Sequence, residues 1–569
     1  MAKSIFNKLK TSFDNLSSSW NDYPRPQFKR DSYFSLCGEW ELYVLSKKSQ
    51  KSFVGDIVVP FSPESDLSNV NRTLKKGESW IYKKIFDLPT GFAEYKVILH
   101  FGAVDQICSV HLNGKFVGEN VGGYLPFEFD VTPFLAEKEN VLEVRVLDNL
   151  DANLGYGKQR TKRGGMWYTP ISGIWQSVWL ESVPKNYIES IKITPTLDSV
   201  NIRVKGGDDQ KTIEIEGIET PFTFTGDQIT INIPSPVLWT PDNPHLYNFK
   251  LTSGSDSIQS YFALRTISIN KINGNAKIFL NDAPFYFHGV LDQGYYPDGI
   301  YTPSSPQGFK FDIMKMKSLG FNTLRKHIKI EPDLFYYYCD KLGMIVFQDM
   351  VNSGKYSYLF DTVIPTILCK KNIEKRGTKK QREYFEKHSL KTLEHLYNHP
   401  SVCYYTIFNE GWGQHDSDNY YQKFKVIDST RIYDTTSGWF EKKKSDVDSK
   451  HVYFKKLNLS ARSDRPLIIS EFGGYAYKVD GHVFNNQKNY GYQTYKSLQE
   501  LTEGIKDLYL NQLLSCVKRG VNGDIITQLS DIEDEINGFL SYDRQVCKVD
   551  EKVMVDIYTK LNEAFIESL

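Results

Sequence analysis

The chain has 569 residues, which is too long for one ordinary domain and predicts three or four domains, or fewer if one of them is an α/β barrel. Its 69 Lys and Arg residues balance its 69 Asp and Glu residues, so no global field favours nucleic acid or an anionic membrane as a partner. We expect a neutral or locally recognised partner.

The cysteines and the N-terminal residues indicate where the protein resides. Seven cysteines are scattered without a C-x-x-C pair, which indicates neither a disulfide framework nor a zinc site. The chain begins without a continuous apolar segment, and no run of 18 apolar residues occurs anywhere. We therefore predict a soluble, cytoplasmic protein that binds neither nucleic acid nor membrane.

Residues 1–184 have the pattern of a β-sandwich. Short alternating segments are separated by Gly, Pro, Asn and Asp, and Asn113-Gly114 supplies a tight hairpin turn. This spacing without helical stretches predicts a jelly roll. The segments are 40–43, 80–86, 95–101, 107–112 and 141–146.

The stretch 160–175 within this region is too rich in glycine and aromatic residues to be a strand. It is either a loop that touches substrate or the mouth of a barrel, or an aromatic plug at the contact between two domains.

Residues 185–270 contain a second set of strands, whose length and spacing predict an immunoglobulin-like sandwich. The predicted strands are 188–194, 200–204, 213–215, 229–233, 247–251 and 260–267.

Residues 271–569 alternate between strands and helices, which predicts a closed (β/α)8 barrel with its chemistry at the carboxyl ends of the strands. The predicted strands are 285–291, 321–325, 344–347, 402–408, 467–470 and 524–527, and the predicted helices are 312–319, 333–342, 381–397, 492–518 and 552–564. The segment 354–380 has no clear pattern and is interpreted as a long loop, either solvated or, less readily, phosphate-binding.

Two glutamates follow apolar strands of this barrel. Glu410 follows the run V-C-Y-Y-T-I-F-N at 402–409, and Glu471 follows L-I-I-S at 467–470. Two carboxyl groups on neighbouring barrel strands are the minimum equipment for cleaving a glycosidic bond. In an arbitrary α/β protein such residues are more often caps or ion-pair partners.

Short fragments in a fixed order give the chain its resemblance to glycoside hydrolase family 2, which includes β-galactosidases, β-glucuronidases and β-mannosidases. They are Y-P-R-P at 23–26, V-P-F-S-P-E-S at 59–65, L-N-G-K at 112–115, G-I-W-Q at 173–176, A-L-R-T at 263–266, F-H-G-V at 287–290, H-P-S-V at 399–402, F-N-E at 408–410 and S-E-F-G at 470–473. The resemblance implies a sugar-binding jelly roll, an immunoglobulin-like sandwich and a catalytic barrel.

The same resemblance implies roles for individual residues. Glu410 is expected to be the general acid/base and Glu471 the nucleophile of a retaining, double-displacement reaction, with Asn409 on the sugar 2-hydroxyl. Arg325 would orient the nucleophile, and His327 is a candidate although it stands in an R-x-H rather than an R-x-x-H spacing. The further substrate-binding candidates are Asp292, Asp349, Trp412, Trp439 and Gln528.

The sequence indicates the identity of the terminal sugar less clearly than the type of reaction. The chain lacks the N-x-K element of β-glucuronidases, ends its eighth strand with Thr527-Gln528 rather than an aromatic residue, and shows no counterpart of the β-galactosidase metal ligands. We expect an exo-acting β-glycosidase without metal or cofactor, with a galactoside ahead of a glucoside, arabinoside or uronide. A non-catalytic carbohydrate-binding protein on the same scaffold and a β-glucuronidase-type enzyme are the alternatives, and a homo-oligomer is possible.

Overall fold

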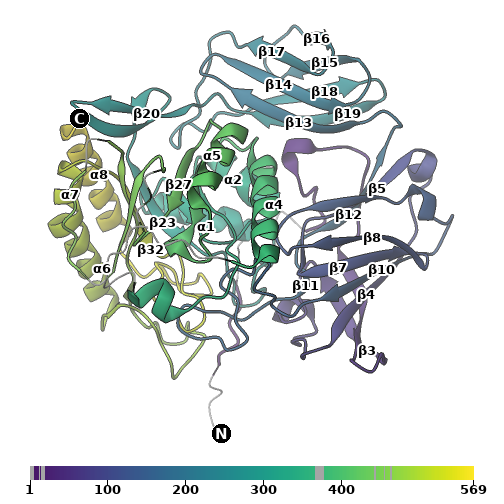
Figure 1. Cartoon of the computed structure of the whole chain (residues 1–569), viewed down its shortest axis with the longest axis horizontal. Helices are drawn as coiled ribbons and strands as arrows, with labels where there is room; N and C mark the ends of the chain where they lie inside the picture. Colours follow the sequence, from purple (N-terminus) through teal and green to yellow (C-terminus); the bar gives the residue numbers. More distant parts are fainter. Residues whose placement is uncertain are drawn as a thin grey trace.

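Two β-sandwiches stand against a barrel in the computed structural model, which describes residues 6–11, 13, 20–364, 377–440, 442, 444–453, 455–461 and 464–569. The jelly roll lies beside the barrel and the immunoglobulin-like sandwich lies over both (Figure 1). No helix in these described ranges is long and apolar enough to cross a membrane.

The first sandwich has a four-stranded sheet, β1-β12-β5-β9, facing a six-stranded sheet, β3-β2-β4-β10-β7-β8. Alternate residues point into the space between them, as in β7, where Cys108, Val110 and Leu112 are buried. Asn113 and Gly114 both have positive φ (53° and 76°), so the predicted hairpin turn is confirmed. The strands are β1 (Tyr33–Ser35), β2 (Gly38–Leu45), β3 (Lys51–Val59), β4 (Ser79–Phe86), β5 (Lys96–Phe101), β6 (Val104–Asp105), β7 (Ile107–Leu112), β8 (Lys115–Val121), β9 (Phe127–Asp130), β10 (Asn140–Leu147), β11 (Gly173–Ile174) and β12 (Val178–Val183).

The second sandwich has a three-stranded sheet, β13-β14-β17, and a four-stranded sheet, β16-β15-β18-β19, so the immunoglobulin-like prediction is confirmed. A three-stranded sheet, β20-β21-β22, connects it to the barrel. The strands are β13 (Ile188–Pro195), β14 (Ser199–Gly206), β15 (Gln210–Ile215), β16 (Phe222–Thr225), β17 (Gln228–Asn232), β18 (Tyr247–Ser253), β19 (Asp256–Phe262), β20 (Ile267–Ile272), β21 (Asn275–Leu280) and β22 (Ala283–Pro284).

The third unit is a nearly closed parallel barrel with the strand order β27-β26-β25-β24-β23-β32-β29-β28. The strands that lead to Glu410 and Glu471, β26 and β29, are therefore not neighbours as expected, because β27 and β28 lie between them. Its strands are buried on both faces, which explains why they read as continuous apolar runs. The strands are β23 (Phe287–Asp292), β24 (Thr323–Lys326), β25 (Ile345–Asp349), β26 (Val402–Phe408), β27 (Ile432–Thr436), β28 (Asp448–Val452), β29 (Leu467–Gly473) and β32 (Val521–Thr527), with the short pair β30 (Tyr475–Ala476) and β31 (Gln493–Thr494) outside the barrel.

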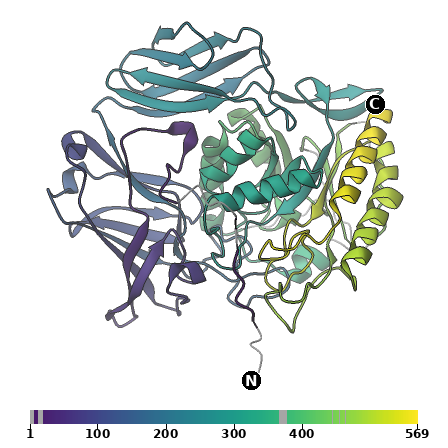
Figure 2. The ribbon, with the colours of Figure 1, turned by 180° about the vertical axis from the view of Figure 1, so that it is seen from behind.

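Helices surround this barrel, and α4 stands between it and the jelly roll, whereas α6, α7 and α8 cover the opposite side (Figures 1 and 2). They are α1 (Gln307–Ser318), α2 (Asp333–Leu342), α4 (Lys379–Leu396), α5 (Ser417–Ile427), α6 (Leu498–Asp507), α7 (Leu514–Lys518) and α8 (Glu551–Glu567), with π-helical turns η5 (Tyr358–Val363) and η7 (Leu508–Leu513).

The strands β27 and β28 and the helix α5 carried no signal in the sequence analysis. β28 reads D-S-K-H-V, with polar residues where a barrel strand normally has apolar ones, and its His451 belongs to the site described below. Of the segment 354–380, residues 365–376 lie outside the described part of the chain, and the rest contains η5 and the start of α4.

Candidate active site

A polar residue lies at or near the carboxyl end of each barrel strand, at the same mouth of the barrel. Parallel strands bring their carboxyl ends together, so residues far apart in sequence become neighbours. The residues at or next to these ends are Asp292, Lys326, Asp349, Asn409, Ser437, His451, Glu471 and Gln528.

Arg325 organises the centre of the mouth. Its side chain is fully buried, and its Nε donates to Asp349 (3.0 Å), its Nη1 to Glu471 Oε1 (2.9 Å) and its Nη2 to Asn409 Oδ1 (2.8 Å). A rigid guanidinium with five N–H groups can satisfy three acceptors at fixed angles. The predicted contact between Arg325 and Glu471 is therefore present.

Glu471 is held as a carboxylate. Its burial opposes the charge, but His451 and Arg325 outweigh burial and lower the pKa of Glu471 to about 2. Tyr453 donates its hydroxyl to Glu471 Oε2 at 2.6 Å and lies 2.7 Å from the Thr527 hydroxyl. An ionised, oriented carboxylate is the form that attacks an electrophilic carbon.

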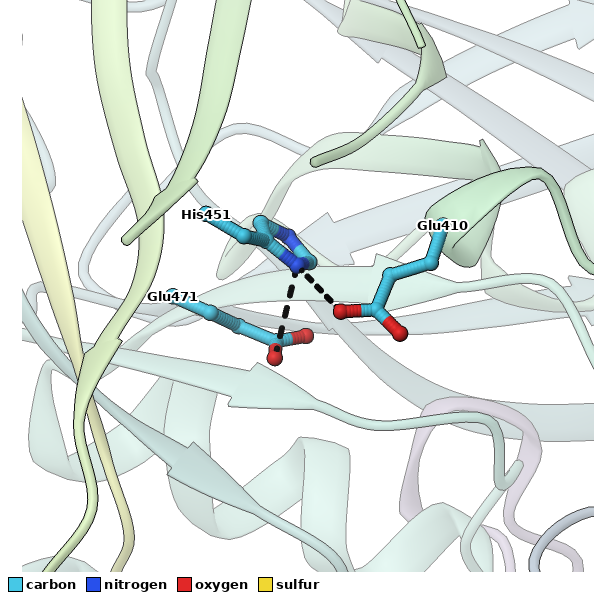
Figure 3. Close-up of side chains that lie close together, drawn as sticks. All are labelled: Glu410, His451 and Glu471. Atoms are coloured by element: carbon cyan, nitrogen blue, oxygen red, sulfur yellow. Dashed lines mark hydrogen bonds and ion pairs between the residues drawn. The ribbon is translucent and has the colours of Figure 1, made fainter. Parts of the chain in front are cut away.

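His451 lies between the two glutamates (Figure 3). Its Nδ1 is 2.8 Å from Glu410 Oε1 and 3.5 Å from Glu471 Oε2. Its Nε2 lies 3.3 Å from Arg325 Nη1. One ligand atom from each of the three residues lies within 4.8 Å of the others, a spacing that a metal ion could also use.

Glu410 is positioned by its own backbone. It has φ 51° and ψ 27°, the left-handed region, which non-glycine residues seldom adopt. Its N–H donates to the Ser437 hydroxyl at 3.3 Å, and that hydroxyl donates to Asn409 Oδ1 at 3.0 Å. The loop after β27 thus fixes the Asn409-Glu410 pair.

Asp349 and His327 extend the network. Asp349 Oδ2 is 2.7 Å from His327 Nδ1. Burial raises the pKa of Asp349, but Arg325 and His327 outweigh it, so the pKa is lowered overall. His327 therefore belongs to the same network as the glutamates despite its shifted spacing.

Asp292 and Gln528 belong to neighbouring networks. Asp292 accepts from the Lys326 ammonium at 2.6 Å, within a buried cluster that includes Glu331. Gln528 accepts from Gln293 at 2.6 Å and donates to Asn537 at 2.7 Å. Their contact with a sugar hydroxyl stays a prediction.

The two tryptophans differ in exposure. Trp412 is 2% exposed, donates its indole N–H to the Gly354 carbonyl at 2.8 Å, and meets the rings of Tyr156 and Trp167 edge-on. Trp439 is half-buried and stands 6.0 Å from the His451 ring. Stacking of either ring on a sugar stays a prediction, and Trp439 has the more accessible surface.

The jelly roll contributes to this mouth through the loop that follows β10. Tyr168 donates its hydroxyl to Glu535, and Gln293 donates to the Tyr168 hydroxyl at 2.7 Å. Trp167 packs on Trp412 with ring centres 5.3 Å apart. These contacts fit both interpretations of 160–175, because the loop reaches the barrel mouth and its aromatic side chains are buried between the two domains; contact with substrate stays a prediction.

Several residues of the site escaped the sequence analysis, namely Ser437, His451, Tyr453, Tyr168 and Glu535. Ser437 directly follows β27 and His451 lies in β28, the two strands that were not recognised, and Tyr168 comes from another domain. A weak signal was present, because His451 and Tyr453 end the segment D-S-K-H-V-Y before Glu471.

The family descriptions that match the sequence follow the three units in order. "Glycosyl hydrolases family 2, sugar binding domain" matches residues 35–184, "Glycosyl hydrolases family 2" matches 186–265, and "Glycosyl hydrolases family 2, TIM barrel domain" matches 271–548. The chain belongs to glycoside hydrolase family 2. Its three units are thus the sugar-binding β-sandwich, the immunoglobulin-like β domain and the TIM barrel of that family.

The curated proteins that resemble the chain have two kinds of name. A β-galactosidase of Thermoanaerobacter pseudethanolicus is 28% identical over 299 residues, which cover 48% of this chain and 39% of that protein. A putative β-glucuronidase of Formosa agariphila is 23% identical over 442 residues, which cover 70% of this chain and 49% of that protein. The chain therefore spans less than half the length of either relative.

Solved structures of family 2 match almost the whole chain. A β-D-glucuronidase of Dictyoglomus thermophilum has a TM-score of 0.73 and 19% identity, covering 95% of this chain and 98% of that one. A β-galacturonidase of Eisenbergiella tayi bound to galacturonate has a TM-score of 0.69 and 18% identity, covering 94% and 99%. At this identity the likeness shows the fold alone.

Proposed function

We propose that the chain is a retaining exo-β-glycosidase in which Glu471 attacks the anomeric carbon and Glu410 is the general acid/base. The observation that carries the proposal is the approach of one oxygen of Glu410 and one of Glu471 to within 4.8 Å. Retaining glycosidases hold their two carboxyl groups about 5 to 5.5 Å apart, whereas inverting ones leave roughly 6.5 to 9.5 Å for a water molecule.

The surrounding residues suit the two steps of this reaction. Glu471 Oε1 accepts from Arg325 and Oε2 from Tyr453, so the carboxylate is fixed before it attacks. Glu410 is the more exposed of the two glutamates, which suits contact with a leaving group and then with water. In the first step Glu410 gives its proton to the leaving oxygen while Glu471 forms the glycosyl ester, and in the second Glu410 takes a proton from the water that cleaves that ester.

A panel of nitrophenyl α- and β-glycosides tests the reaction type. We expect turnover of at least one β-glycoside with retention at the anomeric carbon, observed by NMR of the first-formed sugar. Glu471→Ala should lower kcat by a factor of about 10⁴ or more, since the covalent route is lost. The surface variant Glu563→Gln is the control for an unrelated carboxyl change.

The outcome also separates the alternatives that the sequence left open. Inversion of configuration would contradict the mechanism. Sugar binding without turnover of any glycoside would identify a non-catalytic carbohydrate-binding protein. The order of activity on galactosides, glucosides, arabinosides and uronides tests the expectation of a galactoside.

A further inference from the structure

The jelly-roll loop 154–168 carries a lysine into the barrel mouth. The Tyr156 ring meets Trp412 edge-on at 5.4 Å. A Cβ added to Gly157 would stand 3.3 Å from the carbonyl oxygen of Ile328, the residue after His327. Lys158 follows directly, and its ammonium lies 5.5 Å from the centre of the Trp167 ring. Lys158 is therefore next to the part of the site that contains His327.

The backbone of Lys158 is fixed by its neighbours. The buried Gln159 donates to Asp105 at 3.0 Å and accepts from the Ile171 N–H at 2.7 Å. The Lys158 carbonyl accepts from the Tyr168 N–H at 3.0 Å. A lysine on so constrained a segment loses less entropy when it binds a ligand than one on a free loop.

The Lys158 ammonium has no ion-pair partner in the part of the chain that the structure describes, unlike its neighbours at the mouth. Arg163, from the same loop, pairs with Glu533 (3.2 Å) and Asp534 (3.3 Å). Lys326 and Lys329 both pair with Glu331, at 2.8 Å and 2.9 Å. Lys158 is thus a half-buried cation that has no carboxylate contact among the residues that the structure describes.

The positive charge of Lys158 affects the pKa values of two barrel residues, His327 and Glu535. Burial and then Lys158 lower the pKa of His327, against the opposing contact with Asp349. Burial raises the pKa of Glu535, and Lys158 acts against that rise. The hydrogen bonds of Glu535 go to two other residues, since its Oε1 accepts from Asn537 and its Oε2 from Tyr168.

Resting on the proposed function, we propose that Lys158 binds the carboxylate of the terminal sugar and that the substrate is a β-hexuronide. A hydroxymethyl group, as in a galactoside, would leave the Lys158 ammonium without a counter-charge. A carboxylate at the same carbon supplies a charge-assisted hydrogen bond. The specificity-determining cation would come from the jelly roll rather than from the barrel.

Matched substrates that differ only at that carbon test the proposal. They are the nitrophenyl β-galactoside and β-galacturonide, and the nitrophenyl β-glucoside and β-glucuronide. We expect the intact chain to have the higher kcat/KM for the acidic member of at least one pair. Lys158→Met keeps the length of the side chain and should lower the acidic-to-neutral ratio of kcat/KM about 10- to 100-fold, the range of a hydrogen bond to a charged group.

Lys162→Met is the control, because it removes the same charge from an exposed position of the same loop. Its ratio should equal that of the wild type. A neutral preference in both pairs would overturn the uronide proposal and leave the glycosidase proposal standing. An equal loss on acidic and neutral substrates in Lys158→Met would also overturn it, since it would show a structural role.

If no glycoside is turned over, the proposed function fails. The proposed carboxylate site is then tested by the binding of free sugars. Calorimetry on the intact chain would compare free galacturonate and glucuronate with galactose and glucose. Binding of a uronate that Lys158→Met abolishes and Lys162→Met keeps would support the carboxylate site. Equal binding of acidic and neutral sugars, or no binding, would overturn it.

Discussion

At the scale of single residues, Arg325 sets the geometry of the reactive groups. One guanidinium contacts Asp349, Asn409 and Glu471, which come from three different strands. Breaking such a buried pair leaves an uncompensated charge, which typically costs about 3 to 5 kcal/mol. The position of Glu471 relative to Asn409-Glu410 thus depends on one side chain.

The charge on Glu471 predicts a dependence of stability on pH. Its pKa is about 2 in the folded chain and about 4.3 in an unfolded one, so its contribution is complete above the unfolded value and is lost as pH falls toward the folded value. Between pH 5.5 and 3.5 this one group should remove about 1 kcal/mol of unfolding free energy. Urea unfolding at both pH values measures it.

Glu471→Gln is the comparison, because the variant cannot titrate at this position. Between pH 5.5 and 3.5 the unfolding free energy of the variant should fall by about 1 kcal/mol less than that of the wild type. Parallel pH curves for the two proteins would contradict the depressed pKa of Glu471.

At the scale of elements, the loop after β27 shapes the acid/base side of the site. Gly438 has φ +83°, and a Cβ there would stand 3.0 Å from His451 Nδ1 and 3.3 Å from Glu410 Cγ. The loop therefore needs glycine both for its backbone conformation and for the space that His451 and Glu410 occupy.

Gly438→Ala should disturb turnover more than stability. The positive φ costs an alanine about 1 kcal/mol, and the displaced His451 and Glu410 should lower kcat about 10-fold or more. Gly226→Ala is the matched control, since Gly226 has φ +90° and nothing within 4 Å of an added Cβ. It should show a similar loss of stability with unchanged kcat, and an equal kcat in both variants would contradict this role of the loop.

At the scale of the whole molecule, the jelly roll and the barrel share a buried aromatic contact. Trp175 is completely buried, and its ring lies 5.1 Å from Tyr301 of the barrel and 6.0 Å from Tyr124 of the jelly roll. Its carbonyl accepts from Thr302 at 2.7 Å. This contact joins the jelly roll to the barrel.

Trp175→Ala should therefore weaken the assembly of the two units. Truncating a buried tryptophan typically costs about 3 to 5 kcal/mol, and activity should be lost at a lower temperature than in the wild type. Phe116→Ala is the control, because Phe116 is a jelly-roll aromatic that is 57% exposed, and its removal should change stability by less than about 0.5 kcal/mol. Equal inactivation temperatures for both variants would contradict the importance of the contact.

The sequence by itself determined the family, the order of the three folds and the two strands that carry Glu410 and Glu471. Those strands are apolar runs with a polar end, and their signal is local, as is that of the Asn113-Gly114 hairpin. The domain limits at 184 and 270, the roles of the site residues, an oligomeric assembly and a cytoplasmic location stay predictions.

Only the tertiary structure decided which residues surround the two glutamates. His451 lies on a polar strand, and barrel closure brings it between Glu410 and Glu471. Lys158 reaches the same mouth from the jelly roll, near a histidine 169 positions further along the chain. A local pattern reports the period of a strand or helix, whereas such contacts depend on how distant segments pack, which no local pattern contains.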